Sequence, residues 1–306
     1  MRALWIVGSA LAFSASALWA QDDVYGPALL DLPASTRALA LGGAYVTAHA
    51  DPDALFYNPA LLVAARGVGL AYQRWGEASD LGQVSAAMEL APGGLGVGLR
   101  FLNHEVPVEV PGSLRLAESE LFRRGGEPSS SLEAVLGYAR EVGPVRVGVA
   151  GKYIQEQVGG GRDADVTLDV GAAMRVGPVM VGLAARNVAG DLEPVPTRRS
   201  VFPRQIALHA SHPREAVGPL DVVTTAAVSV VEGGEVVPAA GLELAYWPVG
   251  GKTFVGRLGV RRPVDGLGPV TAGGAFVGDR FAVEYAYARF EDGSGTHRIG
   301  VRWRER

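Results

Sequence analysis

Residues 281–288 read FAVEYAYA, with Phe, Val and two Tyr on the odd positions and Ala or Glu on the even positions. Successive side chains of a β-strand point to opposite faces of a sheet. This segment therefore predicts a strand with one large apolar face and one face that is small or charged. Residues 166–174 (VTLDVGAAM) and 296–303 (THRIGVRW) show the same alternation.

The alternation recurs along most of the chain. Most of the segments span about nine to twelve residues, more than the five to six of an ordinary strand and close to the nine to eleven of a tilted membrane-spanning strand. We therefore predict an all-β fold, a transmembrane antiparallel β-barrel of about 14 strands. The segments lie near 66–75, 81–90, 94–103, 131–141, 144–153, 163–174, 178–187, 204–212, 220–230, 235–247, 253–262, 268–277, 280–290 and 295–303.

The connections between these segments alternate in length through the first half of the chain. Short links such as 91–93 and 142–143 contain Gly or Pro, whereas 104–130 and 188–203 are long. Outer-membrane barrels have short periplasmic turns and long outer loops. We expect the apolar stretch 106–116 to form a pocket lid or a partner contact, and the alternative is a mobile loop.

The composition narrows the functional classes. Lys and Arg number 28 against 32 Asp and Glu, which leaves no basic surplus to bind a nucleic-acid backbone. Cysteine is absent, which excludes disulfides and thiol nucleophiles. Glycine accounts for 42 of the 306 residues, roughly twice the usual share. Small residues on inward faces would leave room inside a barrel, and the segment 26–65 is the simplest occupant.

The first twenty residues carry the pattern of a secretory signal peptide. Arg2 precedes an apolar stretch at 3–17, and the small Ala20 precedes a polar sequence. We expect cleavage after residue 20, and the alternative is a membrane anchor. No later run of 18 apolar residues offers a transmembrane helix. We therefore expect an exported protein of the outer membrane of a Gram-negative-type bacterium.

Residues 26–65 lack the alternating pattern and instead carry helix signals. Asp51 before Pro52 is a typical helix start, with Asp51 as the N-cap. Pro59 should end that short helix. We therefore divide the chain into a signal peptide at 1–20, an N-terminal plug at 21–65 and a barrel at 66–306.

The same region carries a family resemblance. Residues 35–46 (STRALALGGAYV) and 50–60 (ADPDALFYNPA) resemble the N-terminal signature of PorV/PorQ-type outer-membrane proteins, distant relatives of the FadL long-chain fatty-acid transporters. Residues 296–303 resemble the last strand of that group. The resemblance implies a fourteen-stranded barrel with a plug that contains an Asn-Pro-Ala motif. On this basis the plug motif residues are Asp51, Leu55, Phe56, Asn58, Pro59 and Ala60.

Charged residues on the small face of the predicted strands should point into the barrel. They could pair with the plug, for example with Asp51 and Asp53, or they could satisfy each other. The predicted lumen charges are Arg146, Lys152, Asp169, Arg257, Glu284, Arg298 and Arg302.

No catalytic arrangement stands out, and we expect a non-enzymatic protein without cofactor or metal. A Gly-x-Ser-x-Gly motif is absent. His209 and His212 lie three apart on a predicted strand, so they face opposite sides and cannot share a metal. The family resemblance implies an accessory role in type nine secretion, in which the barrel presents cargo to a surface-processing enzyme.

Two alternatives remain at this stage. One is FadL-like passage of hydrophobic small molecules, and the other is a soluble exported β-protein. The expected partners are outer-membrane lipid together with either secreted cargo, a surface-processing protein or a hydrophobic ligand. Nucleic acid is not among them.

Overall fold

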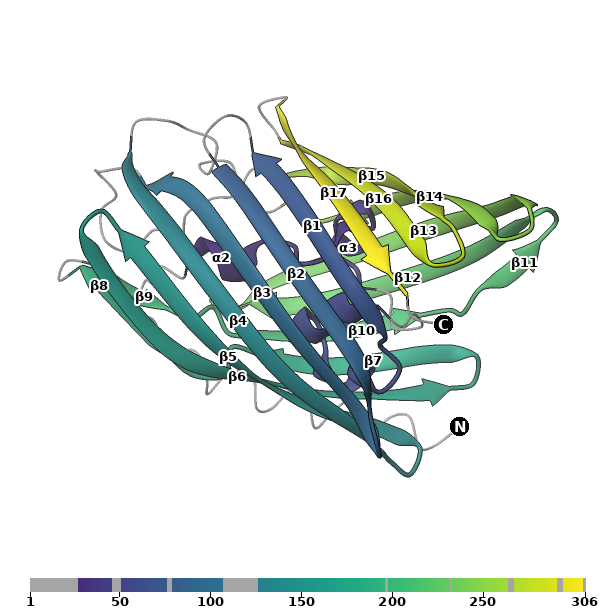
Figure 1. The fold of residues 1–306 in the computed structure, drawn as a ribbon, viewed down its shortest axis with the longest axis horizontal. Helices are drawn as coiled ribbons and strands as arrows, with labels where there is room; N and C mark the ends of the chain where they lie inside the picture. The colour runs from purple at the N-terminus through teal and green to yellow at the C-terminus, as the bar shows by residue number, and fades with distance from the viewer. Residues whose placement is uncertain are drawn as a thin grey trace.

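The computed structural model describes residues 27–45, 51–75, 79–106, 126–195, 198–231, 233–263, 267–290 and 294–304. The body of the molecule is one large antiparallel sheet rolled into a barrel (Figure 1). Its strands are β1 (Gly67–Trp75), β2 (Ser79–Leu90), β3 (Gly93–Val106), β4 (Glu127–Val142), β5 (Val145–Val158), β6 (Gly161–Val176), β7 (Val179–Arg186), β10 (Gln205–Ser211), β12 (Leu220–Val231), β13 (Glu235–Val249), β14 (Lys252–Arg261), β15 (Leu267–Val277), β16 (Phe281–Phe290) and β17 (Gly295–Trp303).

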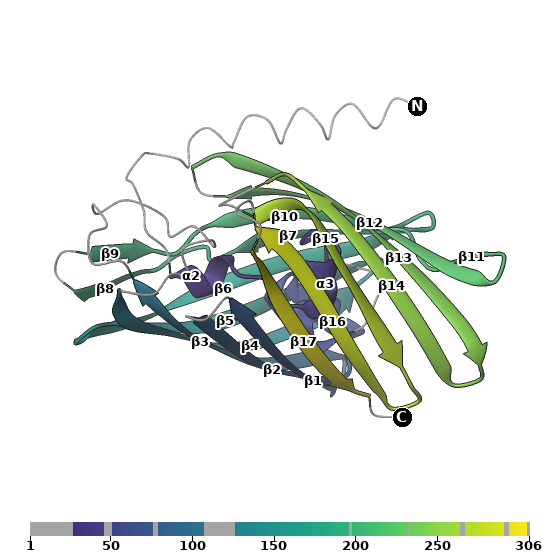
Figure 2. The same ribbon diagram turned by 90° about the horizontal axis from the view of Figure 1, so that it is seen from above.

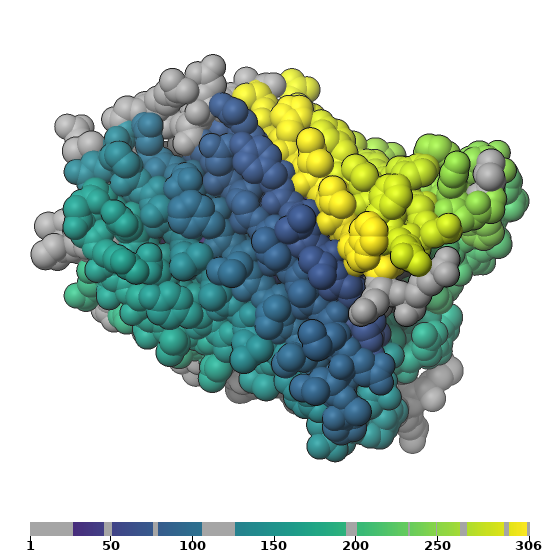
Figure 3. All heavy atoms as spheres, in the orientation of Figure 1, coloured from purple at the N-terminus to yellow at the C-terminus, as the bar shows by residue number. Residues whose placement is uncertain are grey.

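These fourteen strands pair in the order β10-β7-β6-β5-β4-β3-β2-β1-β17-β16-β15-β14-β13-β12, and the pairing of β10 with β12 closes the ring. The first and last strands lie side by side on the surface as a continuous wall (Figure 3). The predicted antiparallel barrel and its strand number are thereby confirmed. A closed barrel leaves no unpaired sheet edge.

The alternation in sequence becomes an inner and an outer face. On β16, Phe281, Val283 and Tyr285 are exposed on the outside, whereas Ala282 and Glu284 are buried. The same holds around the ring, so that the outer face is dominated by large apolar side chains. Examples are Leu70, Leu136, Val166, Leu258 and Ile299, each more than half exposed.

A small hairpin forms a separate two-stranded sheet that is not part of the barrel wall, in a region that the sequence predicts as a long connection. It consists of β8 (Asp191–Val195) and β9 (Arg198–Val201). Leu192 on the hairpin and Phe202 after it are fully buried in a cluster with Leu30 and Ile154. The hairpin is thus tied to the inside of the barrel. A short β11 (Glu215–Val217) follows β10 and pairs with β12.

The helices of the described residues are short and all precede β1. They are α2 (Ala28–Asp31), α3 (Thr36–Ala40) and the 3₁₀ helices η2 (Pro52–Phe56) and η3 (Pro59–Val63). No helix in the described part of the chain is long and apolar enough to cross a membrane. Ser35 caps α3 by accepting a hydrogen bond from the Ala38 amide, and Asn58 caps η3 by accepting one from the Ala60 amide.

We call residues 27–45 and 51–65 the inner segment, because they lie inside the barrel (Figure 2). Wall glycines permit this close approach. A Cβ on Gly94 would lie 2.0 Å from the Leu62 carbonyl oxygen, and one on Gly148 would lie 2.4 Å from the Pro59 carbonyl carbon. Any larger residue at these positions would displace the inner segment. The abundance of glycine therefore has a steric reason.

Candidate functional site

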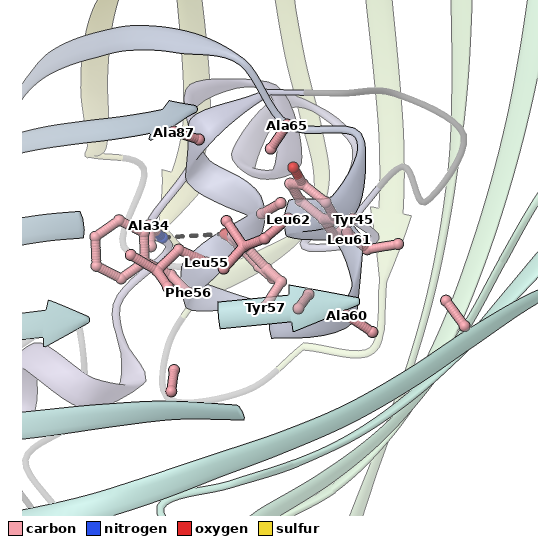
Figure 4. Packing of buried hydrophobic residues seen from close by; sticks show 14 of the residues in the cluster. Ala34, Tyr45, Leu55, Phe56, Tyr57, Ala60, Leu61, Leu62, Ala65 and Ala87 are labelled. Carbon is pink, nitrogen blue, oxygen red and sulfur yellow. Dashed lines mark hydrogen bonds between the residues drawn. The ribbon is translucent and has the colours of Figure 1, made fainter. Parts of the chain in front are cut away.

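The apolar side of the inner segment forms the largest buried cluster (Figure 4). The Tyr45 and Tyr57 rings stack with their centroids 4.5 Å apart. The Tyr57 hydroxyl accepts hydrogen bonds from the backbone amides of Ala34 (3.0 Å) and Ser35 (3.2 Å). These contacts join the start of α3 to the end of η2. The cluster includes the predicted motif residues Leu55, Phe56 and Ala60.

Asn58 attaches the inner segment to the wall. It is fully buried, and its Nδ2 donates to the carbonyl oxygens of Ala172 (3.1 Å) and Leu183 (3.2 Å). Its Oδ1 accepts from the Ala60 amide. The amide side chain therefore bonds to β6, to β7 and to its own helix. Pro59 is buried beside it at the first position of η3.

Asp51 has a different role from the one that the sequence predicts. Its side chain makes no capping hydrogen bond to η2. Instead it accepts a 2.6 Å hydrogen bond from the Tyr45 hydroxyl and lies 3.4 Å from the Arg302 guanidinium. Asp51 is therefore the N-cap residue by position, with Pro52 after it as predicted, but a buried tyrosine and a wall arginine bind its carboxylate in place of the helix amides.

Alternating charges link the inner segment to the wall. Arg37 Nη2 lies 2.6 Å from Glu243 Oε1, and Glu243 Oε2 lies 2.8 Å from Arg257 Nε. Arg257 and Arg302 both contact Glu284, at 2.8 and 2.6 Å. Arg302 also forms an ion pair with Asp51 on the inner segment. The chain of ion pairs begins at α3 of the inner segment, runs through residues of β13, β14, β16 and β17, and ends at Asp51 before η2.

Arg298 is fully buried and holds the inner segment through neutral acceptors. It donates to the Pro33 carbonyl (3.1 Å), to Thr36 Oγ1 (3.2 Å) and to Gln83 Oε1 (2.9 Å). Gln83 in turn donates to Asp53 at 2.8 Å. Burial and the nearby Asp51 carboxylate raise the pKa of Asp53 from its ordinary 3.8 to about 6.

A further group of charges lies across β3 to β6. Lys152 Nζ is 2.7 Å from Asp169 and 3.6 Å from Glu133. Arg100 contacts Glu133 at 3.0 Å and donates to the Leu32 carbonyl at 2.8 Å. The inner segment is thus held from both sides of the barrel.

Arg146 is the predicted lumen charge that the structure places elsewhere. It has the inward parity of Lys152 but lies beside the β4–β5 turn, where its side chain is 25% exposed and contacts Glu141 at 3.2 Å. The wall extends past the inner segment at this end, so parity alone does not give burial. Arg146 therefore keeps the inward parity but takes no part in the buried ion-pair network.

Several residues of the network are absent from the sequence prediction. Glu243 and Arg100 occupy inward positions of predicted strands, so the same alternation could have found them. Arg37 lies on a helix, where that rule does not apply. His209 is inward and almost fully buried, whereas His212 follows the strand and is 36% exposed, so the two do not face a common metal.

One side of the inner segment does not fill the space beside the wall. A cavity of about 130 Å³ lies between residues 30–34 and the inner faces of β7, β10, β12 and β13. Its apolar lining includes Leu30, Leu32 and Tyr57, and its polar lining includes Arg186 and His209. Arg186 donates to the Phe56 carbonyl at 3.0 Å and stacks over the Tyr57 ring. The cavity therefore borders Tyr57, which lies between Phe56 and Asn58 of the predicted plug motif.

Comparison with known proteins supports the fold. No family model matches the chain, and no curated protein matches it either. Among solved structures, the Ralstonia pickettii toluene transporter TbuX is 14% identical, with 93% of this chain and 99% of that one covered and a TM-score of 0.52. The monoaromatic hydrocarbon channel CymD is 12% identical over 89% and 98%, with a TM-score of 0.61.

A Pseudomonas aeruginosa FadL homologue is 9% identical over 89% of this chain and 99% of its own, with a TM-score of 0.53. The fold is therefore that of a FadL-like β-barrel. At these identities the likeness concerns the fold alone. Membership of the PorV/PorQ group stays a prediction.

Proposed function

We propose that the protein is an outer-membrane channel for small hydrophobic molecules, the first alternative of the sequence analysis. The observation that carries the proposal is the cavity between the inner segment and the wall. It is the size of a single small molecule and lies within a barrel that shares its fold with a toluene transporter and a monoaromatic hydrocarbon channel.

The outer face supports a membrane location. Large apolar side chains on β1, β6, β14 and β17 are about half exposed or more, as at Leu70, Val166, Leu258 and Ile299. Such a surface is unfavourable in water and suits hydrocarbon. Localisation in the outer membrane of a Gram-negative-type bacterium follows. The predicted signal peptide at 1–20 lies outside the described residues.

In this proposal residues 21–65 act as the plug. At rest the plug is held by buried ion pairs and by Asn58, so the lumen is filled. Passage requires a second arrangement of the barrel, in which the plug has moved. A substrate shifts the protein toward this arrangement only if it binds the moved arrangement more tightly than the resting arrangement. The Arg37–Glu243 and Arg302–Asp51 contacts are the ones that this movement has to break.

The secretion role stays a prediction. Its candidate contact surface is the apolar stretch 106–116, of which residues 107–116 lie outside the described residues. No described contact favours it over the channel. The solved structures of similar fold named above are transporters and channels, which supports a non-enzymatic role.

Immobilising the plug tests the channel. A Cβ on Gly300 would lie 3.4 Å from the Thr36 Cβ, close to disulfide geometry. Since the chain has no cysteine, Thr36→Cys with Gly300→Cys would form one defined bond. Cells that express the parent should take up radiolabelled toluene faster than vector cells. The oxidised double variant should not, and reduction should restore uptake.

The two single variants are the matched controls. A Cβ on Gly300 lies 2.7 Å from Thr36 Oγ1, so each single variant is compared with itself, and its uptake should be the same with and without oxidation. Parent uptake equal to that of vector cells would contradict the channel. Undiminished uptake by the oxidised double variant would contradict movement of the plug.

A further inference from the structure

We propose that the cavity beside the inner segment binds a small organic anion, a monocarboxylate about the size of one aromatic ring. This inference names a substrate class for the proposed channel and rests on that function. Three features of the cavity support it. These are the row of paired residues on its wall, the arginines that lack an ion pair, and the cavity volume.

The wall of the cavity carries a register row of four inward residues. His209 on β10 pairs with Ala227 on β12, Ala227 pairs with Ala239 on β13, and Ala239 pairs with Arg261 on β14. All four line the cavity. Because directly paired residues share a face of the sheet, the two alanines form a floor between a histidine and an arginine.

Several polar atoms around this floor lack protein partners. Both ring nitrogens of His209, Nε and Nη2 of Arg261 and Nε of Arg186 are buried without a hydrogen-bond partner among the described residues. His209 itself is only 4% exposed. Buried polar groups are normally satisfied. Three separate side chains that each carry an unsatisfied nitrogen around one cavity indicate a polar ligand.

The charge of the two arginines indicates the sign of that ligand. Arg37, Arg100, Arg257 and Arg302 each form an ion pair with a buried carboxylate. Arg186 and Arg261 form no ion pair with any described residue. Asp31 is the one acidic residue among the described lining, against these two cations. A carboxylate is the group that guanidinium binds best in this setting.

The rest of the lining fits a compact apolar body. Leu30, Leu32, Tyr57, Val231 and Val237 lie around the cavity. Its volume of about 130 Å³ is close to the roughly 150 Å³ of an engineered protein cavity that binds benzene. A single ring with one carboxylate matches both the volume and the charge, whereas a long acyl chain does not.

Calorimetric titration of the purified, detergent-solubilised protein tests the proposal. The probes are benzoate and its neutral isostere benzamide. We expect benzoate to bind at least about tenfold more tightly, because a charged hydrogen bond is worth that much or more. Arg261→Gln should remove most of this preference and leave benzamide binding unchanged. The matched control is Arg262→Gln, since Arg262 is exposed and outside the cavity lining.

Equal affinities for the two probes, or no binding of benzoate, would overturn the inference. The inference would also be overturned if Arg261→Gln and Arg262→Gln changed the preference for benzoate over benzamide by the same factor. The mobility shift of the folded barrel on unheated gels shows whether each variant folds. If Arg261→Gln does not fold, Arg186→Gln takes its place in the titration. Benzoate binding without uptake of either radiolabelled toluene or radiolabelled benzoate would contradict only the channel, and toluene uptake without benzoate binding would contradict only this inference.

Discussion

Arg37 on the inner segment and Glu243 on β13 are 206 residues apart in sequence and form a buried bidentate pair, with Nε–Oε2 at 2.9 Å and Nη2–Oε1 at 2.6 Å. Two parallel charge-assisted hydrogen bonds fix orientation as well as distance. Glu243 also accepts from Arg257. One carboxylate thus serves a plug cation and a wall cation together.

Glu243→Gln should release α3 from the wall. It leaves the buried Arg37 guanidinium without its acid and Arg257 with Glu284 alone, and breaking a buried pair in this way destabilises by about 3–5 kcal/mol. We expect faster tryptic cleavage after Arg37 in the folded barrel and more leakage of a small solute from liposomes. Glu89→Gln is the control, because Glu89 is 71% exposed where it pairs with Arg66. Equal effects of the two substitutions would argue against the network.

Asn58→Ala should loosen the inner segment at its other attachment. The substitution removes two hydrogen bonds to wall carbonyls and the cap of η3, a loss of about 1–3 kcal/mol. Liposome leakage should rise. Asn103→Ala on the exposed face of β3 should have no effect. Leakage equal to that of the parent would count against the plug role of the Asn58–Pro59 motif.

Gly171→Ala should act on the same contact from the wall side. A Cβ there would lie 2.0 Å from Asn58 Oδ1, and Asn58 is held on both sides and cannot move away. Gly151→Ala is the control on the neighbouring strand, because its nearest atom would be 3.9 Å away. We expect leakage from Gly171→Ala alone. If neither the Gly171→Ala variant nor the Gly151→Ala variant leaks more than the parent, the wall accommodates the methyl group at 171.

The hold on the inner segment should weaken as pH rises. The pKa of Asp53 is about 6 in the buried site and 3.8 when free, so the docked state binds the proton more strongly. Docking is therefore favoured at pH values below 3.8 and loses that advantage as the pH rises through 6. Tryptic cleavage after Arg37 in detergent should be faster at pH 7.5 than at pH 5.5, after correction for trypsin activity on a free peptide.

Asp53→Asn is the control for this effect, because the amide does not titrate. It should flatten the corrected pH profile and leave the other carboxylates in place. A profile that is unchanged by the substitution would assign the pH dependence to another group.

The alternation of apolar and small residues predicts much of the architecture, because a barrel wall has only two environments. Lys152, Asp169, Glu284 and Arg298 were placed inside by parity, and the structure buries all four. The same rule fails for Arg146 at a strand end, where facing inward no longer means being covered. Side-chain parity carries no information on depth along the barrel axis.

Other features depend on contacts that no local pattern encodes. The pairing of Arg37 with Glu243 requires the ring to be closed and α3 to be docked. Asp51 follows the sequence rule for an N-cap, yet Tyr45 and Arg302 take its carboxylate. His209 and Arg261 become neighbours of one cavity only through a register row across four strands.

The wall glycines have a consequence for how such a sequence can change over time. A Cβ on Gly96 would lie 2.5 Å from Leu62 Cδ2, so a larger residue at 96 requires the Leu62 side chain to move or to be replaced by a smaller one. Gly256 faces outward, and a Cβ there meets nothing within 4 Å. Substitutions inside the lumen should therefore arise as compensating pairs between distant parts of the chain, whereas lipid-facing positions should vary one at a time.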